Sequence, residues 1–455
     1  MRRETDTIAA ISTALGESGI SIIRISGEDA AVIADRVLDR KISGAPSHTI
    51  HYRHVVHGGE ILDEVLVTLM KAPHTYTGEN TVEINCHGGI LAVQRVLEEV
   101  YRAGAAPAEP GEFSRRAFLN RKMDLSQAEA VMDVIEAKNQ FALKAAMRQL
   151  SGGLSAEIQS LREAILNETA WIEAALDDPE HYDLNGYPEE LMEKLRPLEE
   201  RLETLIRNAD KGRVMKEGIS TVILGRPNAG KSSLLNLLAG EDRAIVTDVA
   251  GTTRDTLTEH IRFADLSLNL TDTAGIRESI DAVERIGVER ARKAAGEADL
   301  LLLVLDSSEA LTEEDRKLLL FCEKRPAVIL LNKTDLKPAV KSGEVQQLTS
   351  HRVILFSAKD RTGLSELEDE IRSLFYHGQI DFNDQIYVTS ARHKAALESA
   401  LKSLKLVEKS ISGGLPEDFF SIDLKDAYEA LGFITGETVE DDVVDRIFER
   451  FCTGK

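Results

Sequence analysis

The chain has 455 residues, more than the roughly 100 to 200 of one ordinary domain, so its length predicts two or three domains. Its 77 acidic and 55 basic residues leave a net charge of −22, which argues against a protein that coats nucleic acid by neutralising phosphates. The 43% hydrophobic and 29% charged residues are typical of a folded soluble protein, and no apolar run approaches the roughly 20 residues of a membrane span.

The N-terminus and the cysteines indicate the compartment. Two arginines near the start are followed at once by acidic residues, without a long apolar run, which argues against a secretory signal. Cys86, Cys322 and Cys452 are odd in number and far apart, which argues against a disulfide framework and a paired-cysteine metal site. We therefore expect a cytoplasmic protein with no membrane insertion, whose contacts with nucleic acid are local or shared with a partner.

The first part of the chain has the pattern of a small α+β domain. Short runs rich in β-branched residues predict strands at 19–25, 64–70 and 81–85, and the apolar spacing at 90–101 predicts a helix.

A helical region follows. Ser126 with Glu129 resembles a capping box, and the later apolar residues keep a helical spacing as far as about Val214. An acidic loop with Pro and Gly interrupts this region at 177–188.

Between residues 218 and 375, strand and helix patterns alternate. Continuous apolar runs at 221–224, 266–270, 300–305, 328–331 and 353–356 predict buried strands of a parallel sheet with helical crossovers. Helical spacing returns after Asp384. We therefore predict a helical domain, interrupted in sequence by an inserted α/β domain with a mostly parallel sheet. The predicted boundaries are 1–118 for the N-terminal α+β domain, 119–214 and 379–455 for the two parts of the helical domain, and 215–378 for the insert.

A phosphate loop opens the inserted domain. Gly225 and Gly230-Lys231-Ser232 have the spacing of this motif, after a predicted strand and before a predicted helix. The backbone amides of such a loop can surround phosphate oxygens, the lysine can reach the β- and γ-phosphates, and the serine hydroxyl can bind Mg²⁺. The alternative is a glycine-rich turn without a ligand.

Three further motifs follow predicted strands in the order that one GTP site needs. Asp272-Thr273-Ala274-Gly275 can hold the metal through water and sense the γ-phosphate, although alone it could be a plain turn. In Asn332-Lys333-Thr334-Asp335, the aspartate can accept hydrogen bonds from both donors of guanine, a pair that adenine lacks. Ser357-Ala358-Lys359 would close the base pocket. The sequence therefore predicts a GTP site in a Ras-like domain.

Hydrolysis needs a positioned water molecule. Ile276 stands where Ras-like proteins have a water-orienting glutamine, which leaves Arg277 and Glu284 as candidates, or as ordinary solvated residues. Residues 247–255 have the pattern of a switch in which Thr253 can bind Mg²⁺. Asn228 can supply an oxygen to a monovalent cation beside the phosphates.

Motifs along nearly the whole chain resemble the MnmE (TrmE) family of bacterial tRNA-modification GTPases. They are Arg24-Ile25-Ser26-Gly27, Thr77-Gly78-Glu79, Glu83 before His87-Gly88-Gly89, Pro110-Gly111-Glu112-Phe113-Ser114, Arg116-Ala117-Phe118-Leu119-Asn120, Lys122-Met123-Asp124-Leu125, residues 225–254 and Phe451-Cys452-Thr453-Gly454-Lys455. Thr453 departs from the usual isoleucine of the family.

The resemblance implies an N-terminal domain that dimerises and binds 5-formyl- or 5,10-methylene-tetrahydrofolate through Arg24, Glu83, Lys122 and Lys455. It also implies K⁺-stimulated dimerisation of the GTPase domains, with K⁺ held by Asn228, Thr247, Val249 and Thr252. Ser232 and Thr253 would hold Mg²⁺, and Glu284 would orient the hydrolytic water. Cys452 is a candidate nucleophile or a structural side chain.

Together, the motifs and the resemblance give one set of candidate GTP-contacting residues. They are Asn228, Ala229, Gly230, Lys231, Ser232, Ser233, Thr247, Asp248, Val249, Ala250, Gly251, Thr252, Thr253, Asp272, Thr273, Ala274, Gly275, Asn332, Lys333, Thr334, Asp335, Ser357, Ala358 and Lys359.

The expected function is that of a homodimeric GTP hydrolase in tRNA modification. With the FAD-dependent partner MnmG (GidA), it would add an aminomethyl or carboxymethylaminomethyl group to carbon 5 of the wobble uridine of certain tRNAs. One alternative is a regulatory or ribosome-assembly GTPase without modification chemistry. A second alternative is a nucleotide-gated scaffold.

Overall fold

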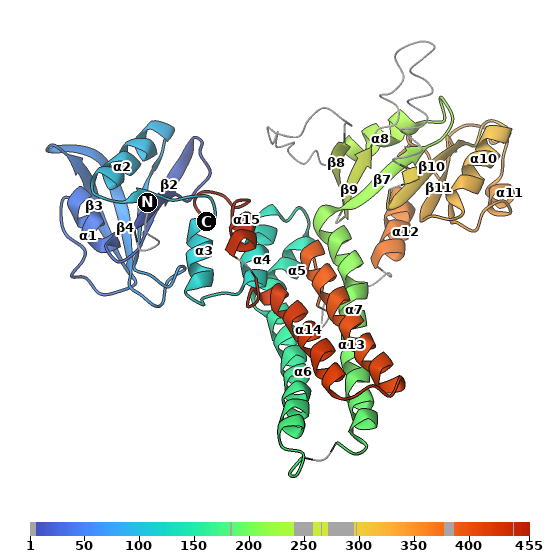
Figure 1. The fold of residues 1–455 in the computed structure, drawn as a ribbon. Coiled ribbons are helices and arrows are strands. Elements are labelled where there is room, and N and C mark those ends of the chain that lie inside the picture. Colours follow the sequence, from blue (N-terminus) through green and yellow to red (C-terminus); the bar gives the residue numbers. More distant parts are fainter. Residues whose placement is uncertain are drawn as a thin grey trace, which may run out of the picture. The chain divides into compact units, whose positions relative to one another are not determined.

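The computed structural model describes residues 6–182, 184–240, 258–264, 266–271, 295–296, 298–376, 386–439 and 441–455. Among these residues, no helix is long and apolar enough to cross a membrane. The chain folds as two compact units (Figure 1). The first comprises Met1–Ile135, Arg148–Leu198 and Ser399–Lys455, and the second Glu136–Met147 and Glu199–Glu398.

A six-stranded sheet forms the N-terminal part of the first unit, in the order β3-β4-β5-β2-β1-β6. Its strands are β1 (Ile8–Ile11), β2 (Ser18–Ser26), β3 (Thr49–His57), β4 (Glu60–Met70), β5 (Thr81–Gly88) and β6 (Ala106–Pro107). All neighbouring strands pair antiparallel except β1 and β6. The strands predicted at 19–25, 64–70 and 81–85 are thus confirmed, whereas β1, β3 and β6 were not predicted.

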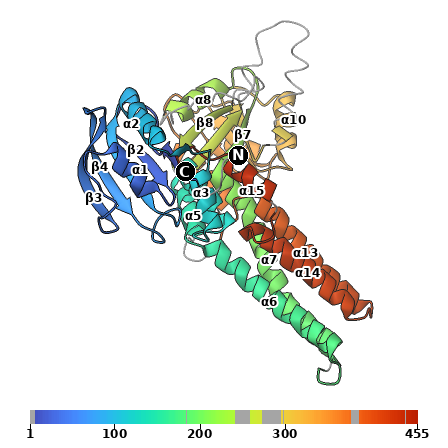
Figure 2. The ribbon, with the colours of Figure 1, turned by 60° about the vertical axis from the view of Figure 1, so that its left-hand side comes forward.

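Two helices, α1 (Ala30–Val37) and α2 (Ile90–Arg102), share a hydrophobic core with this sheet (Figure 2). The predicted helix at 90–101 is confirmed, whereas α1 was not predicted. Strand β2 alternates buried Ile23 and Ile25 with the partly exposed Arg24, because successive side chains point to opposite faces of a sheet. The face opposite the core therefore carries Arg24.

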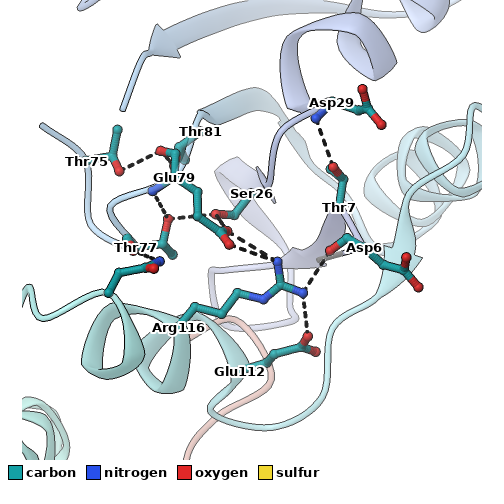
Figure 3. A network of polar contacts seen from close by, with 11 residues as sticks. Asp6, Thr7, Ser26, Asp29, Thr75, Thr77, Glu79, Thr81, Glu112 and Arg116 are labelled. Carbon is teal, nitrogen blue, oxygen red and sulfur yellow. Dashed lines mark hydrogen bonds and ion pairs between the residues drawn. The ribbon is translucent and has the colours of Figure 1, made fainter. Parts of the chain in front are cut away.

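A buried guanidinium joins helix α3 (Glu112–Leu119) to this domain (Figure 3). Arg116 is 5% exposed and donates to the Glu79 carboxylate at 3.2 Å and to Glu112 at 2.9 Å. Ser26 donates to the same Glu79 carboxylate at 2.7 Å and contacts the Thr77 hydroxyl at 2.7 Å. Buried charges need partners, so these residues from four separate sequence motifs have a structural role.

The helical part begins with α4 (Leu125–Glu136), and its cap differs from the sequence prediction. The Asp124 carboxylate accepts from the Gln127 backbone N–H at 2.9 Å, and the Gln127 side chain accepts from the Asp124 N–H at 3.0 Å. The predicted capping box of Ser126 and Glu129 is therefore wrong by two residues: Ser126 lies inside the helix. Aspartate performs the capping role that the prediction gave to serine.

The remaining helices of this part range from 8 to 31 residues in length. They are α5 (Gln140–Leu150), α6 (Gly153–Asp177), α7 (Tyr187–Glu217), α13 (Ala391–Ser412), α14 (Asp418–Thr435) and α15 (Asp441–Phe448). The predicted interruption at 177–188 corresponds to the connection between α6 and α7. Helix α14 packs against α6, where the Arg162 guanidinium lies 4.1 Å from the centre of the Tyr428 ring. Segments about 260 residues apart in sequence thus form one helical layer, as the α6 and α14 helices show.

The C-terminal segment, which belongs to the first unit, packs against earlier parts of that unit. Phe448 and Phe451 share a hydrophobic cluster with Leu125, and the Gly111 N–H donates to the Cys452 carbonyl at 3.3 Å. Gly111 has a φ of +70°, and a Cβ there would lie 2.4 Å from the Phe448 carbonyl oxygen. Only glycine permits both this conformation and this close approach.

The second unit contains a six-stranded sheet in the order β12-β11-β10-β7-β9-β8. Its strands are β7 (Ile219–Leu224), β8 (Thr258–Phe263), β9 (Leu266–Thr271), β10 (Leu300–Asp306), β11 (Ala327–Asn332) and β12 (Val353–Leu355). All pairs are parallel except β8 with β9. Every residue of β10 and β11 is buried, as a parallel sheet covered on both faces requires.

The helices described around this sheet are α8 (Lys231–Gly240), α10 (Glu313–Cys322), α11 (Ser342–Gln346) and α12 (Leu364–Tyr376). Residues of α8 and α12 belong to one hydrophobic cluster and residues of α10 and α11 to another. The mostly parallel sheet and its helical crossovers confirm the prediction for this part of the chain.

We expect Gly212→Ala in α7 to destabilise the protein by about 1 to 3 kcal/mol, because overpacking forces a backbone shift. A Cβ at this position would lie 2.2 Å from the Val388 carbonyl oxygen. The matched control is Gly343→Ala in α11, which meets nothing within 4 Å and should be neutral or stabilising by up to about 1 kcal/mol. Urea unfolding of both variants measures the difference, and equal stabilities would contradict the close approach.

Candidate functional site

The phosphate loop lies between the carboxyl end of β7 and the start of α8, as predicted. Gly225 has a φ of +145°, and a Cβ there would lie 2.4 Å from the Val304 carbonyl oxygen. Asn228 has a φ of +62°, which is uncommon for a residue with a side chain, although asparagine tolerates it best. The loop thus curls in the way that a phosphate cradle requires.

Lys231 is held by the loop itself. Its Nζ donates to the Gly225 carbonyl at 2.7 Å and to the Arg226 carbonyl at 2.6 Å. Ser232 follows in the first turn of α8 and is exposed, as is Asn228. A cation, a hydroxyl and the positive end of a helix dipole therefore meet at one place, which suits an anionic ligand with its metal.

The Asn332 side chain connects two loops of the site. Its Nδ2 donates to the Ala229 carbonyl at 2.9 Å, and its Oδ1 accepts from the Ala358 N–H at 3.1 Å. Asn332 is 2% exposed. The phosphate loop and residues 357–359 are therefore joined through one buried amide.

The predicted base-reading residues lie together. The Ser357 hydroxyl donates to Asp335 Oδ1 at 2.9 Å, and Lys359 Nζ lies 3.8 Å from Asp335 Oδ2. The Thr334 hydroxyl donates to the Phe356 carbonyl at 3.0 Å. The Asp335 carboxylate is thereby oriented while keeping lone pairs free for the two donors of guanine.

The sequence prediction missed Asp306, which ends β10 beside Asn332 in the parallel register. Its carboxylate accepts from Lys333 Nζ at 2.6 Å and from the Ser308 hydroxyl at 2.6 Å. Burial acts to raise the pKa of Asp306, but these hydrogen bonds outweigh it and hold the pKa below its ordinary value. The available sequence signal for this residue was an aspartate directly after the apolar run 300–305.

Several predicted site residues lie outside the described residues. They are Thr247, Asp248, Val249, Ala250, Gly251, Thr252, Thr253, Asp272, Thr273, Ala274, Gly275 and Glu284.

A second polar cluster lies in the N-terminal domain. Arg24 and Glu83 are direct neighbours on β2 and β5, and Arg24 Nε donates to Glu83 Oε1 at 2.9 Å. The Arg24 guanidinium also donates to the Gly454 carbonyl at 3.3 Å. Three of the four predicted folate residues, Arg24, Glu83 and Lys455, are thus brought to one region by the returning C-terminal segment.

Two aromatic rings adjoin this cluster and were not predicted as site residues. The centre of the Tyr76 ring lies 5.3 Å from the Arg24 guanidinium carbon and 5.6 Å from Lys455 Nζ. The Phe113 ring lies 5.6 Å from the same guanidinium. Burial and the nearby Arg24 lower the pKa of Lys455, whereas Glu83 acts to raise it. The cluster can therefore present cations, a carboxylate and flat apolar surfaces to one ligand.

Two predicted residues remain, the fourth folate residue Lys122 and the candidate nucleophile Cys452. Lys122 Nζ donates to the Pro73 carbonyl at 3.2 Å. Cys452 is an exposed free cysteine whose carbonyl accepts from the Lys455 N–H at 3.0 Å.

Comparison with known proteins identifies the family. A family model described as "GTP-binding protein TrmE N-terminus" matches residues 7–122, and one described as "MnmE helical domain" matches residues 125–452. The tRNA modification GTPase MnmE of Lachnoclostridium phytofermentans is 52% identical over 99% of this chain and 100% of its own length. That of Bacillus subtilis is 47% identical over the same shares of the two chains. The chain belongs to the MnmE family of tRNA modification GTPases.

These matches confirm the resemblance and the predicted fold class, and as an MnmE-family member the chain is a GTPase. Among solved structures, the G domain of the T. maritima FeoB iron transporter is 27% identical over 34% of this chain and 98% of that chain, with a TM-score of 0.27. The family assignment depends on the full-length relatives and not on this partial likeness.

We expect Asp335→Asn to weaken GTP binding by about 100-fold or more, because an amide nitrogen would replace an acceptor that faces the guanine donors. Binding of xanthosine triphosphate should rise, because xanthine offers a carbonyl where guanine has an amine. Equilibrium titration with both nucleotides measures this change. The control is Asp360→Asn, an exposed carboxylate of the loop after β12, which should leave both affinities unchanged.

Proposed function

We propose that this GTPase acts with the FAD-dependent partner MnmG (GidA) on certain tRNAs. Together they add an aminomethyl or carboxymethylaminomethyl group to carbon 5 of the wobble uridine. The observation that carries the proposal is the similarity of the whole chain, including both regions that flank the nucleotide domain, to tRNA modification GTPases. A GTPase with only a regulatory or ribosome-assembly role would not need the Arg24, Glu83 and Lys455 cluster.

We further propose that the protein is a cytoplasmic homodimer with four sequence segments. These are a folate-binding and dimerisation domain at 1–118, a helical domain at 119–214 and 379–455, and a GTPase domain at 215–378. The net charge of −22 favours an arrangement in which the partner provides most of the contacts to tRNA.

The N-terminal cluster fits a tetrahydrofolate. Glu83 can accept from the donor edge of a pterin, and Arg24 and Lys455 can bind the carboxylates of its glutamate tail. Tyr76 and Phe113 offer flat surfaces near these charges. Lys122 is proposed as a further contact. Bound 5-formyl- or 5,10-methylene-tetrahydrofolate would supply the one-carbon unit.

Lys455 makes folate binding dependent on pH. Because its pKa lies below the ordinary value, its positive charge is present at low pH and is lost as the pH rises through that lowered pKa. We expect the affinity for 5-formyl-tetrahydrofolate to fall as the pH rises through this lowered pKa, which is below the pH at which an ordinary lysine loses its charge. Lys455→Arg, which stays charged, should flatten this profile. Identical profiles for the two proteins in equilibrium titrations would contradict the role of Lys455.

The GTP site is proposed to hold two kinds of cation. Ser232 would bind Mg²⁺ together with Thr253, and Asn228 would bind K⁺ together with Thr247, Val249 and Thr252. The exposed Ser232 and Asn228 at the start of α8 and in the phosphate loop support this assignment. Glu284 is proposed to orient the hydrolytic water.

We expect GTP hydrolysis to be faster in K⁺ than in Na⁺, because a cation fitted beside the phosphates neutralises the charge of the transition state. Asn228→Gly should remove this preference, since it deletes the amide while glycine tolerates the φ of +62°. Steady-state rates in the two salts, at saturating GTP, measure the effect. Equal rates for the unaltered protein would refute the K⁺ site.

Mass spectrometry of wobble nucleosides tests the modification itself. Cells that lack the protein should lose the modified uridine, and the unaltered gene should restore it. Arg24→Gln should fail to restore it, because Glu83 loses its partner and an anionic ligand loses a cation. Restoration by Arg24→Gln would favour a scaffold, and restoration by Cys452→Ala would favour a structural role for that cysteine over nucleophilic catalysis.

A further inference from the structure

Residues 306–315 run from the last residue of β10 through the connection to the first turn of α10, and they contact both ends of the candidate nucleotide pocket. We infer that this 306–315 segment is a positioning element that keeps the phosphate loop and the base-reading loop in register. The inference rests on the proposed nucleotide pocket and goes beyond it, because none of these residues is among the predicted ligand contacts.

At the base-reading end, the segment holds Lys333 and Asn332. Asp306 Oδ2 accepts from Lys333 Nζ at 2.6 Å. Asp306 Oδ1 accepts from the Ser308 N–H at 2.9 Å and the Ser308 hydroxyl at 2.6 Å. The Ser307 N–H also donates to the Asn332 carbonyl at 2.9 Å. Asp306 is 7% exposed, and each of its carboxylate oxygens accepts a hydrogen bond from a protein group.

At the phosphate end, the segment holds the second residue of the phosphate loop. The Arg226 Nε donates to the Asp315 carboxylate at 2.9 Å. Asp315 is 2% exposed and is itself fixed by the Thr312 N–H at 2.9 Å and the Thr312 hydroxyl at 2.8 Å. Glu309 lies 3.2 Å from the same guanidinium but is exposed, so its contribution is small.

Arg226 links Asp315 to Lys231, the lysine of the phosphate loop. Its side chain is bound by Asp315, while its carbonyl accepts from Lys231 Nζ at 2.6 Å. The segment is thus connected to Lys231 at one end and to Lys333 at the other. A ligand that contacts both loops at once, such as GDP, benefits from a fixed spacing between them, whereas guanosine contacts only the base-reading loop.

A double-mutant cycle on GDP affinity distinguishes two models: the ion pairs act independently, or they act together as one positioning element. If the pairs are independent, their effects on GDP affinity multiply. If the segment sets the spacing, release of either end already loosens it, so release of the second end has a smaller effect. Arg226→Gln should weaken GDP and spare guanosine, whereas Asp306→Asn should weaken both.

The experiment uses the full-length chain with Arg226→Gln, Asp306→Asn and the double variant. We expect each single variant to weaken GDP by about tenfold, and the double variant by clearly less than the product of the two losses. Arg226→Lys, which keeps the charge without the planar fork, should recover part of the loss. Arg316→Gln, which removes an arginine from the exposed face of α10, should leave both ligands unaffected.

Multiplying losses, or unchanged GDP affinity, would overturn the inference. Thermal unfolding without nucleotide separates positioning from folding. If Asp306→Asn does not fold, Ser308→Ala removes the hydroxyl that braces Asp306 and completes the same cycle. Failure of the unaltered protein to bind GDP would instead refute the proposed nucleotide pocket.

Discussion

The nucleotide site depends on the buried amide of Asn332. Parallel pairing sets Asn332 beside Asp306 at the carboxyl edge of the sheet, where the loops after β7, β10 and β12 also emerge. The Asn332 side chain binds Ala229 and Ala358, and its carbonyl accepts from the Ser307 N–H. One residue thus links three loops that are far apart in sequence.

This arrangement also explains why position 230 is a glycine. A Cβ at Gly230 would lie 2.1 Å from Asn332 Nδ2, so a larger residue would break the hydrogen bond to Ala229. The motif glycine is therefore needed for packing against a side chain about 100 residues later in the sequence, as well as for the approach of phosphate. The phosphate loop and the base-reading motif constrain each other before any ligand is bound.

The sequence predicted the parts whose structure depends on neighbouring residues. Buried strands of 219–224 and 327–332 carry continuous apolar runs, and the phosphate loop has fixed spacing, so both could be predicted locally. The pairing of Lys333 with Asp306 depends on strand register, which no local pattern encodes. Likewise, nothing near Arg24 indicates that Gly454 returns to it across the length of the chain. The resemblance implied a folate-binding role for Arg24, but it gave no role to Asp306 or to the buried Arg116.

The two candidate sites hold their cations through different groups. Lys231 donates to two backbone carbonyls of the phosphate loop, which orient its ammonium group. Arg24 is held by the Glu83 carboxylate, so an anionic ligand there has to share the guanidinium with an existing ion pair. Lys455 lies in the same partly buried place beside a second cation, which makes its charge harder to keep. The N-terminal cluster therefore gains most from a ligand that brings donors for Glu83 together with anions for Arg24 and Lys455, whereas a simple phosphate satisfies only the cations.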